Sequence, residues 1–151
     1  MRLDGGQCRE RFAAGRHAVL AANDAAGAPL AVPITFALVR DGDGADVVVF
    51  AVDHKPKSGA PLRRMQLIAA DPRVAVLVEH YDADWQHLWW VRADGRAEVL
   101  PTGRPECDPA DAERRAGLTA LADRYPQYVE HPPAGDLVRI RVDRWTGWAY
   151  A

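Results

Sequence analysis

The clearest hydrophobic pattern in the chain is an alternation over residues 30–39, LAVPITFALV. Large apolar side chains occupy every second position of this stretch: Leu30, Val32, Ile34, Phe36 and Leu38. Such a period of two predicts a β-strand with these five side chains on one face. Pro33 has no backbone N–H to donate to a neighbouring strand, so we expect a sheet edge or a bulge at this point.

Similar patterns predict five further strands and three helices. Apolar or alternating runs bounded by turn residues favour strands over residues 17–23, 47–52, 73–81, 87–100 and 136–148. Helical spacing favours helices over residues 7–15, 61–70 and 109–124. Asp108 and Pro109 are suited to the N-cap and first position of the last helix. We therefore expect a mainly β fold of about six antiparallel strands, closed into a small barrel with the helices packed outside.

Composition places the chain among ordinary globular proteins. Its 151 residues suit a single domain spanning residues 1–151, and the net charge of -2 gives no overall attraction to nucleic acid or an anionic membrane. The N-terminus lacks an apolar core, and the longest aliphatic or aromatic run, residues 47–52, is too short to span a membrane. Cys8 and Cys107 lie far apart in no metal-type spacing. We expect a soluble cytoplasmic protein with two free thiols.

Several common catalytic and metal motifs are missing from the sequence. Ser58 is the only serine and has no nucleophile-elbow pattern around it, and no glycine-rich phosphate loop occurs. The DGDGAD stretch at residues 41–46 lacks the closing glutamate of a calcium loop and is interpreted as a turn. The segment HYDADWQH, residues 80–87, offers two histidines and two aspartates in a spacing that matches no recurrent metal site. No side chain stands out as catalytic, and we expect no bound metal.

An unusual group of positive charges follows the apolar run at residues 47–52. Within residues 52–65 the chain carries four cations: Lys55, Lys57, Arg63 and Arg64. These are its only lysines, whereas arginine supplies the other positive charges. One interpretation is a solvated basic loop. The other is a site for a phosphorylated or polyanionic small molecule, because compact ammonium groups bind phosphate and a helix start favours anions. Pro56 and Pro61 stiffen the segment, which favours the second interpretation.

The adjacent pair Trp89 and Trp90 lies within a predicted strand. Successive side chains of a strand point to opposite faces, so both rings cannot enter one core. One of them should therefore lie at an interface or stack on a ligand, which predicts a homodimer.

Five segments together resemble the pyridoxamine phosphate oxidase-like flavoproteins. They are VPITFALV, VVVFAVDHKPK, LRRMQLIAADPRVAVLVEHY, LWWVRADGRAEVL and DRWTGW, and the resemblance runs from about residue 7 to residue 149. Within that family the chain looks most similar to the branch that binds the deazaflavin coenzyme F420. The resemblance implies a split β-barrel that works as a homodimer, with the cofactor sites between the subunits.

The resemblance also implies which residues bind the cofactor. The strand whose backbone approaches the ring would comprise Val32, Pro33, Ile34 and Thr35. The loop that holds the phosphate would contain Asp53, His54, Lys55 and Lys57, with Arg63 and Arg64 extending the positive surface. Trp90 and Trp145 match positions that reach the cofactor from the partner subunit. The chain lacks the RxxLLK signature of the true pyridoxamine phosphate oxidases, which argues against pyridoxamine phosphate as substrate and FMN as cofactor.

The activity that this resemblance implies is hydride transfer between a bound deazaflavin and a small organic acceptor. The cofactor would supply the chemistry, and the protein would supply orientation and exclusion of water. Two alternatives stay open. The same fold could bind FMN and act as a flavin reductase or oxidase, or it could carry the cofactor without catalysing a reaction.

Overall fold

A computed structural model describes residues 1–52 and 63–151 of the chain. Its helices are α1 (Gly5–Ala14), α2 (Arg63–Ala70), α3 (Pro109–Arg124) and α4 (Gln127–Glu130), with a 3₁₀ turn η1 (Trp85–His87). Its strands are β1 (Ala18–Asn23), β2 (Pro29–Ile34), β3 (Ala37–Arg40), β4 (Asp46–Ala51), β5 (Arg73–His80), β6 (Trp89–Leu100) and β7 (Leu137–Ala149). None of the described helices is long and apolar enough to cross a membrane.

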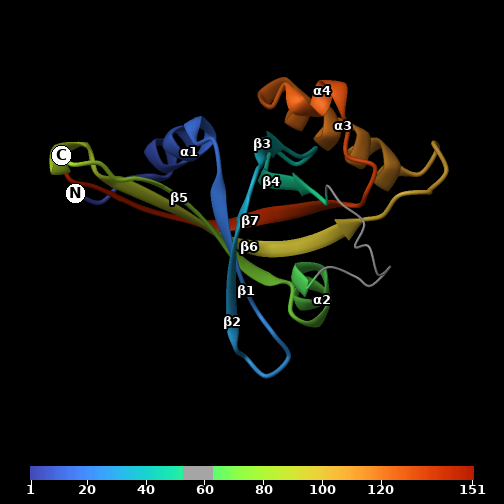
Figure 1. The fold of residues 1–151 in the computed structure, drawn as a ribbon, viewed down its shortest axis with the longest axis horizontal. Coiled ribbons are helices and arrows are strands. Elements are labelled where there is room, and N and C mark those ends of the chain that lie inside the picture. Colours follow the sequence, from blue (N-terminus) through green and yellow to red (C-terminus); the bar gives the residue numbers. More distant parts are fainter. Residues whose placement is uncertain (53–62) are drawn as a thin grey trace.

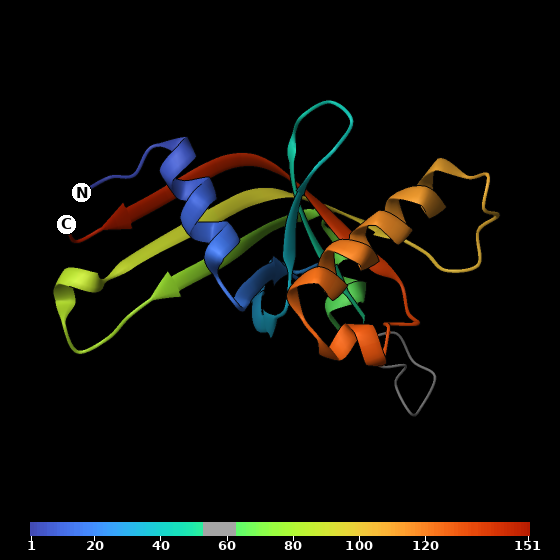
Figure 2. The same ribbon diagram turned by 90° about the horizontal axis from the view of Figure 1, so that it is seen from above.

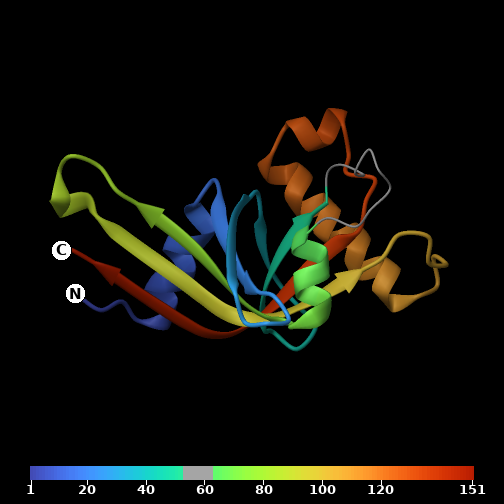
Figure 3. The ribbon, with the colours of Figure 1, turned by 60° about the horizontal axis from the view of Figure 1, so that its bottom comes forward.

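The strands form one antiparallel sheet in the order β2-β1-β5-β6-β7-β4-β3, flanked by helices. This confirms the predicted fold class, a mainly β split barrel with flanking helices. In Figure 1 the long β5, β6 and β7 strands run toward a tip near both chain termini, while α2 lies on the other side of these strands from α3 and α4. Figure 3 shows the two termini close together beside that tip.

The expectation of a single strand over residues 30–39 is wrong, because this stretch forms two strands, β2 and β3. β2 lies at one edge of the sheet and β3 lies at the opposite edge, so the chain crosses over at Thr35 and Phe36. The predicted alternation of large apolar side chains nevertheless continues from β2 into β3. All five of the large apolar side chains in this stretch belong to or pack against one hydrophobic core. The described residues therefore form seven strands where the pattern predicted about six.

Two hydrophobic cores lie on the two faces of the sheet, here called the inner and the outer face. The inner core contains Phe12 of α1 and Leu67 and Ile68 of α2, packed against the barrel strands. The outer core contains Leu121 of α3 together with Leu137 of β7 and neighbouring residues of β3, β4 and β6. Figure 2 shows α1 and α3 near opposite ends of β7. The helix α3 covers only part of the outer face.

The sequence also encodes where the helices begin. Asp4 and Gln7 form a reciprocal capping box, in which each side chain accepts a hydrogen bond from the backbone N–H of the other residue (2.8 and 3.0 Å). The Asp108 carboxylate accepts from the Ala110 N–H (2.9 Å), with Pro109 as the first helical residue of α3. The predicted start of α3 is thus confirmed, and α1 begins two residues before its predicted start.

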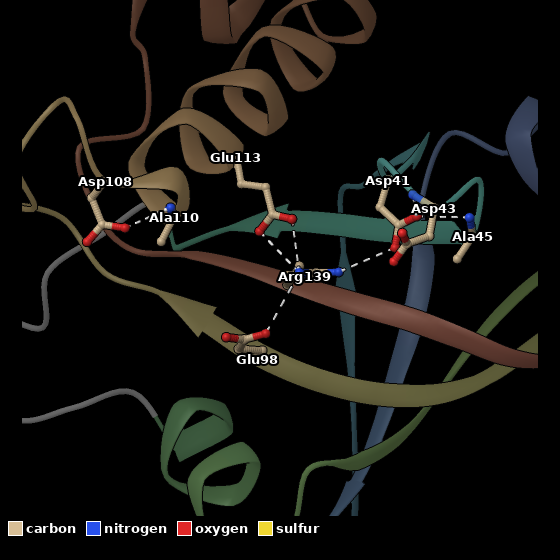
Figure 4. Close-up of polar contacts among 8 residues, drawn as sticks. All are labelled: Asp41, Asp43, Ala45, Glu98, Asp108, Ala110, Glu113 and Arg139. Carbon is tan, nitrogen blue, oxygen red and sulfur yellow. Dashed lines mark hydrogen bonds and ion pairs between the residues drawn. The ribbon is translucent and has the colours of Figure 1, made fainter.

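A group of charged side chains joins α3 to the sheet through ion pairs (Figure 4). The Arg139 guanidinium on β7 lies 3.0 Å from a carboxylate oxygen of Glu113 on α3, 3.9 Å from Glu98 on β6 and 3.8 Å from Asp41. Its side chain is only 18% exposed, so these contacts are partly shielded from water. The cluster links α3, β6, β7 and the β3–β4 turn.

Asp41 is held in this cluster by backbone hydrogen bonds as well as by Arg139. It accepts from the backbone N–H groups of Ala45 and Asp43 (2.9 Å each). The bond from Ala45 is the main reason that the pKa of Asp41 lies below its ordinary value; burial opposes the shift, while the Asp43 bond and the charges of Arg141 and Arg139 add to it. The charged form is therefore favoured in the folded state, where this carboxylate closes the turn.

We expect Asp41→Asn to make stability less dependent on acid pH. A carboxyl whose folded pKa is lowered stabilises the fold above its unfolded pKa of about 3.9, and that contribution is lost as pH falls through the folded pKa. Asparagine keeps an acceptor oxygen but not the charge, so the melting temperature should fall at pH 7 and change less on acidification. Thermal melts from about pH 7 to pH 2 would measure this. Asp123→Asn, at an exposed position of α3, is the control, and equal pH profiles for both variants would contradict the assignment.

Candidate cofactor site

The first part of the candidate site is the edge strand β2. Val32 and Ile34 point into the inner core, whereas Pro33 is exposed. Among the described residues β2 pairs only with β1, so one side of its backbone has no ladder partner. This confirms the expectation that Pro33 lies on an edge. A strand of this kind offers unpaired backbone N–H and C=O groups to a planar ligand.

Register places the start of β3 near the end of β4. β3 and β4 are antiparallel neighbours, with Ala37, the first residue of β3, opposite Val49. β4 ends two residues after Val49, at Ala51, and the basic segment follows it in the sequence. The Ala37–Val49 pair is therefore only a few residues from the end of β2 and from the start of the basic segment.

The crossing at Thr35 and Phe36 is held by two tyrosines. The hydroxyl groups of Thr35 and Tyr128 are 2.8 Å apart. The Tyr125 hydroxyl accepts from the Phe36 N–H (3.2 Å) and lies within hydrogen-bond distance of the carbonyl oxygens of Phe36 (3.0 Å) and Arg16 (2.8 Å). These bonds replace the ladder bonds that the backbone forgoes where it leaves the sheet.

Arg124, at the end of α3, completes this support. Its guanidinium donates to the carbonyl oxygens of Ala13 (2.9 Å) and Gly15, at the C-terminal end of α1. The same group lies 4.8 Å from the centre of the Phe36 ring, in a cation–π contact. The sequence reasoning missed Arg124, Tyr125 and Tyr128, because they lie about ninety residues from the strand that they support.

The predicted phosphate loop can be located only in part. Asp53, His54, Lys55 and Lys57 lie outside the described residues. Arg63 and Arg64 are the first two residues of α2, which packs against the inner core through Leu67 and Ile68. The segment therefore connects the end of β4 to the start of α2, as the sequence predicts.

An open hollow of about 690 Å³ lies on the part of the outer face that α3 leaves uncovered. It is lined mainly by apolar and aromatic side chains of β1, β2, β5 and β6 and of Tyr81, which follows β5. The strand residues are Val19, Ala21, Ala31, Ala75, Leu77 and Trp90, with Glu79 and Arg92. Trp90 is half-buried and pairs across the strands with Glu79 and Trp148. The size and lining are typical of sites for drug-sized or cofactor-sized ligands.

Trp145 does not belong to this hollow. Its ring packs edge-on against Phe12 of α1 (5.0 Å between ring centres), and its indole N–H donates to Asp46 (3.1 Å). It contacts the inner core, whereas Trp90 lines the outer face. Within one subunit the structure therefore does not bring these two tryptophans together.

Both cysteines are free thiols, as predicted. Cys8 lies on the buried face of α1, and burial, followed by the charge of Asp4, raises the pKa of its thiol, while Arg11 opposes the shift. A buried thiol of raised pKa is a poor nucleophile. Cys107 is exposed in the loop before α3, away from the β2 edge.

Comparison with known proteins decides the family. The sequence model described as pyridoxamine 5'-phosphate oxidase matches residues 5–149. The chain belongs to this family. Membership in the pyridoxamine 5'-phosphate oxidase family accounts for the seven-stranded sheet and the flanking helices. No curated protein is similar enough to match.

Solved structures agree on the fold. A FAD-binding protein from Mesorhizobium loti is 20% identical, with a TM-score of 0.69 over 97% of this chain and 93% of that chain. A conserved protein of unknown function from Corynebacterium diphtheriae is 21% identical, with a TM-score of 0.70 over 100% and 98%. A heme storage protein from Vibrio cholerae is 14% identical, with a TM-score of 0.62 over 99% and 95%. The same fold thus serves different cofactors in these proteins.

Proposed function

We propose that the chain is an oxidoreductase that binds the deazaflavin coenzyme F420 and transfers a hydride between it and a small organic acceptor. The observation that carries this proposal is the Ala37–Val49 pair, which lies a few residues from the end of β2 and from the end of β4, after which both lysines of the chain follow. A backbone edge suits the polar rim of a flavin-like ring, and lysines suit its phosphate. Family membership and the FAD-binding relative support a ligand of this class.

The number of cations favours the deazaflavin over FMN. FMN carries one phosphate, whereas coenzyme F420 adds a polyglutamate tail. Lys55 and Lys57 could neutralise a phosphate, which leaves Arg63 and Arg64 for the carboxylates of a tail. The FAD-binding relative keeps a flavin reductase or oxidase as the second candidate, with FMN as the cofactor.

The chain's own contribution is binding, orientation and exclusion of water. A bound deazaflavin supplies the hydride chemistry. The Thr35–Tyr128 hydroxyl pair and the Tyr125 bonds to Phe36 would keep the β2 edge rigid against the ring. The apolar hollow beside Trp90 would exclude water from the face where an acceptor stacks.

The uncovered outer face also supports a homodimer. Half-buried apolar side chains from β1, β5 and β6 form a continuous surface there, bordered by the Arg92–Asp94 ion pair (2.8 Å). An apolar centre with a charged rim is the usual composition of a protein interface. We propose that a second copy covers this face, so that Trp90 of each subunit reaches the cofactor of the other.

Leu77→Asp is expected to convert the dimer into monomers. Leu77 lines the hollow, and a buried, unpaired carboxylate at a two-fold interface would be repeated in both subunits. Light scattering at micromolar protein should give the monomer mass for this variant and the dimer mass for the parent. Val129→Asp, at an apolar position of α4 that is 67% exposed, should remain dimeric. A monomeric parent, or a dimeric Leu77→Asp protein, would contradict the interface.

A turnover assay distinguishes an oxidoreductase from a protein that only carries the cofactor. Reduced deazaflavin is mixed anaerobically with a panel of small acceptors, with and without the protein, and the absorbance of the oxidised coenzyme is followed. An oxidoreductase oxidises many equivalents of coenzyme at a rate proportional to protein concentration. A carrier binds the coenzyme but gives no reaction with any acceptor above the protein-free rate.

A further inference from the structure

Three arginines form a row across neighbouring strands of the outer face. In the antiparallel register Arg73 of β5 lies opposite Arg96 of β6, and Arg96 lies opposite Arg141 of β7. Residues directly opposite each other share a face, and adjacent strands are about 4.8 Å apart. Like charges in this arrangement destabilise a sheet. All three side chains are exposed, and the chain as a whole is acidic, so the row is a local concentration of positive charge.

The row borders a second hollow, of about 460 Å³, next to the apolar one. Its lining includes Arg73 and Arg96 together with Asn23, Asp94 and Asp143. A β-bulge between Asp94 and Gly95 shapes this region. Gly95 is required there because a Cβ would collide with the Arg141 carbonyl oxygen. Bulges of this kind often occur beside binding sites, where they redirect side chains.

The charges around the second hollow are not all available. Asp71 holds Arg73 through two bonds, from Nε (3.1 Å) and Nη2 (2.9 Å), which fixes the orientation of its guanidinium. Asp94 pairs with Arg92 (2.8 Å) and Arg144 (3.1 Å), so its carboxylate is already neutralised.

Arg96 differs from these neighbours. Among the described residues no carboxylate lies within ion-pair distance of Arg96. The hollow therefore presents one pre-oriented guanidinium, one guanidinium without an ion-pair partner, and the amide of Asn23.

We propose that this second hollow binds an oxyanion, the phosphate or carboxylate group of a small molecule. Guanidinium groups bind such groups through paired, charge-assisted N–H···O bonds. Bound oxyanion would also relieve the repulsion along the arginine row. Arg96 is the main ligand and Asn23 adds a neutral donor, whereas Arg73 adds only the N–H groups that Asp71 leaves free. The residues named here belong to β1, β5, β6 and β7, and the proposal does not depend on the proposed cofactor.

Asp143 gives the proposal a second, opposite consequence. Its carboxylate also lines the hollow and would repel an anion. Removing this charge should strengthen oxyanion binding, whereas removing the charge of Arg96 should weaken it. If the arginines were merely solvated and bound no ligand, neither substitution would change oxyanion binding.

The test uses inorganic phosphate and, in a separate arm, triglutamate as the carboxylate probe, each titrated calorimetrically at constant ionic strength. The background protein carries Lys55→Ala, Lys57→Ala, Arg63→Ala and Arg64→Ala, which removes the other proposed anion site. Arg96→Gln should weaken binding about tenfold or more, the usual effect of losing a charged hydrogen bond, and Asp143→Asn should strengthen it several-fold. Arg104→Gln, an exposed arginine in the loop before α3, should change nothing.

The two probes distinguish the ligand classes. Binding of phosphate alone assigns a phosphorylated ligand, and binding of triglutamate alone assigns a carboxylate ligand. The proposal is overturned if neither probe binds to the background protein at millimolar concentration. It is equally overturned if Arg96→Gln binds as well as the background, or if Arg104→Gln loses as much affinity as Arg96→Gln.

Discussion

Phe12→Ala is expected to lower the free energy of unfolding by about 3 to 5 kcal/mol, the usual cost of removing a buried phenylalanine ring. The Phe12 side chain is fully buried between α1 and the sheet. Its ring centre lies 4.9 Å from that of Phe36 and 5.0 Å from that of Trp145. Truncation would leave a cavity under the crossing at Phe36, so chemical denaturation should show a large fall in stability.

Phe12→Leu is the matched control. Leucine keeps most of the buried volume, so its cost should stay below about 1.5 kcal/mol. If Phe12→Ala lost as little stability as Phe12→Leu, the inner core would not depend on this ring. The packing of α1 against Phe36 and Trp145 would then need another explanation.

Lys55→Ala and Lys57→Ala are each expected to weaken deazaflavin binding by about 1.5 to 3 kcal/mol, the range for a hydrogen bond to a charged group. This corresponds to roughly tenfold to a hundredfold or more in affinity. Binding to either variant should also fall less steeply with added salt, because one screened contact has been removed. Both positions lie outside the described residues, so the expectation rests on the sequence and on the register that leads into this segment.

Folding stability provides the internal check on the lysine variants. A surface cation contributes little to stability, so both variants should unfold like the parent. Arg104→Ala, which removes an exposed cation in the loop before α3, should leave binding unchanged. If both lysine variants bound either cofactor as tightly as the parent, the basic segment would be a solvated loop.

Much of the fold could be predicted because local patterns determine it. Period-two alternation identified most of the strands, and Asp108 with Pro109 fixed the start of α3. The break between β2 and β3 could not be predicted in the same way. The side chains on both sides of the break enter the same inner core, so their alternation carries no trace of it. The bonds that redirect the chain come from Tyr125 and Tyr128, which are distant in sequence.

The candidate site was likewise predictable where local sequence features determine it and not where distant parts of the chain do. Pro33 predicted the β2 edge from its missing N–H alone, and the β3–β4 hairpin was evident from its turn residues. The face of Trp145 was not predictable, because the register of β7 shifts between Val142 and Arg144. Counting by twos from Val142 would put Arg144 in the core, but the extra residue reverses the faces and places Trp145 there.

The most direct test of the account is a titration of the purified protein with coenzyme F420 and with FMN, followed by quenching of tryptophan fluorescence. Trp90 in the apolar hollow is the expected main reporter, so Trp90→Phe should reduce the quenching more than it reduces the affinity. We expect saturable quenching by both cofactors, with the deazaflavin bound about tenfold or more tightly, because only its tail can engage the additional arginines. Equal or tighter binding of FMN, or no saturable response to the deazaflavin, would contradict it.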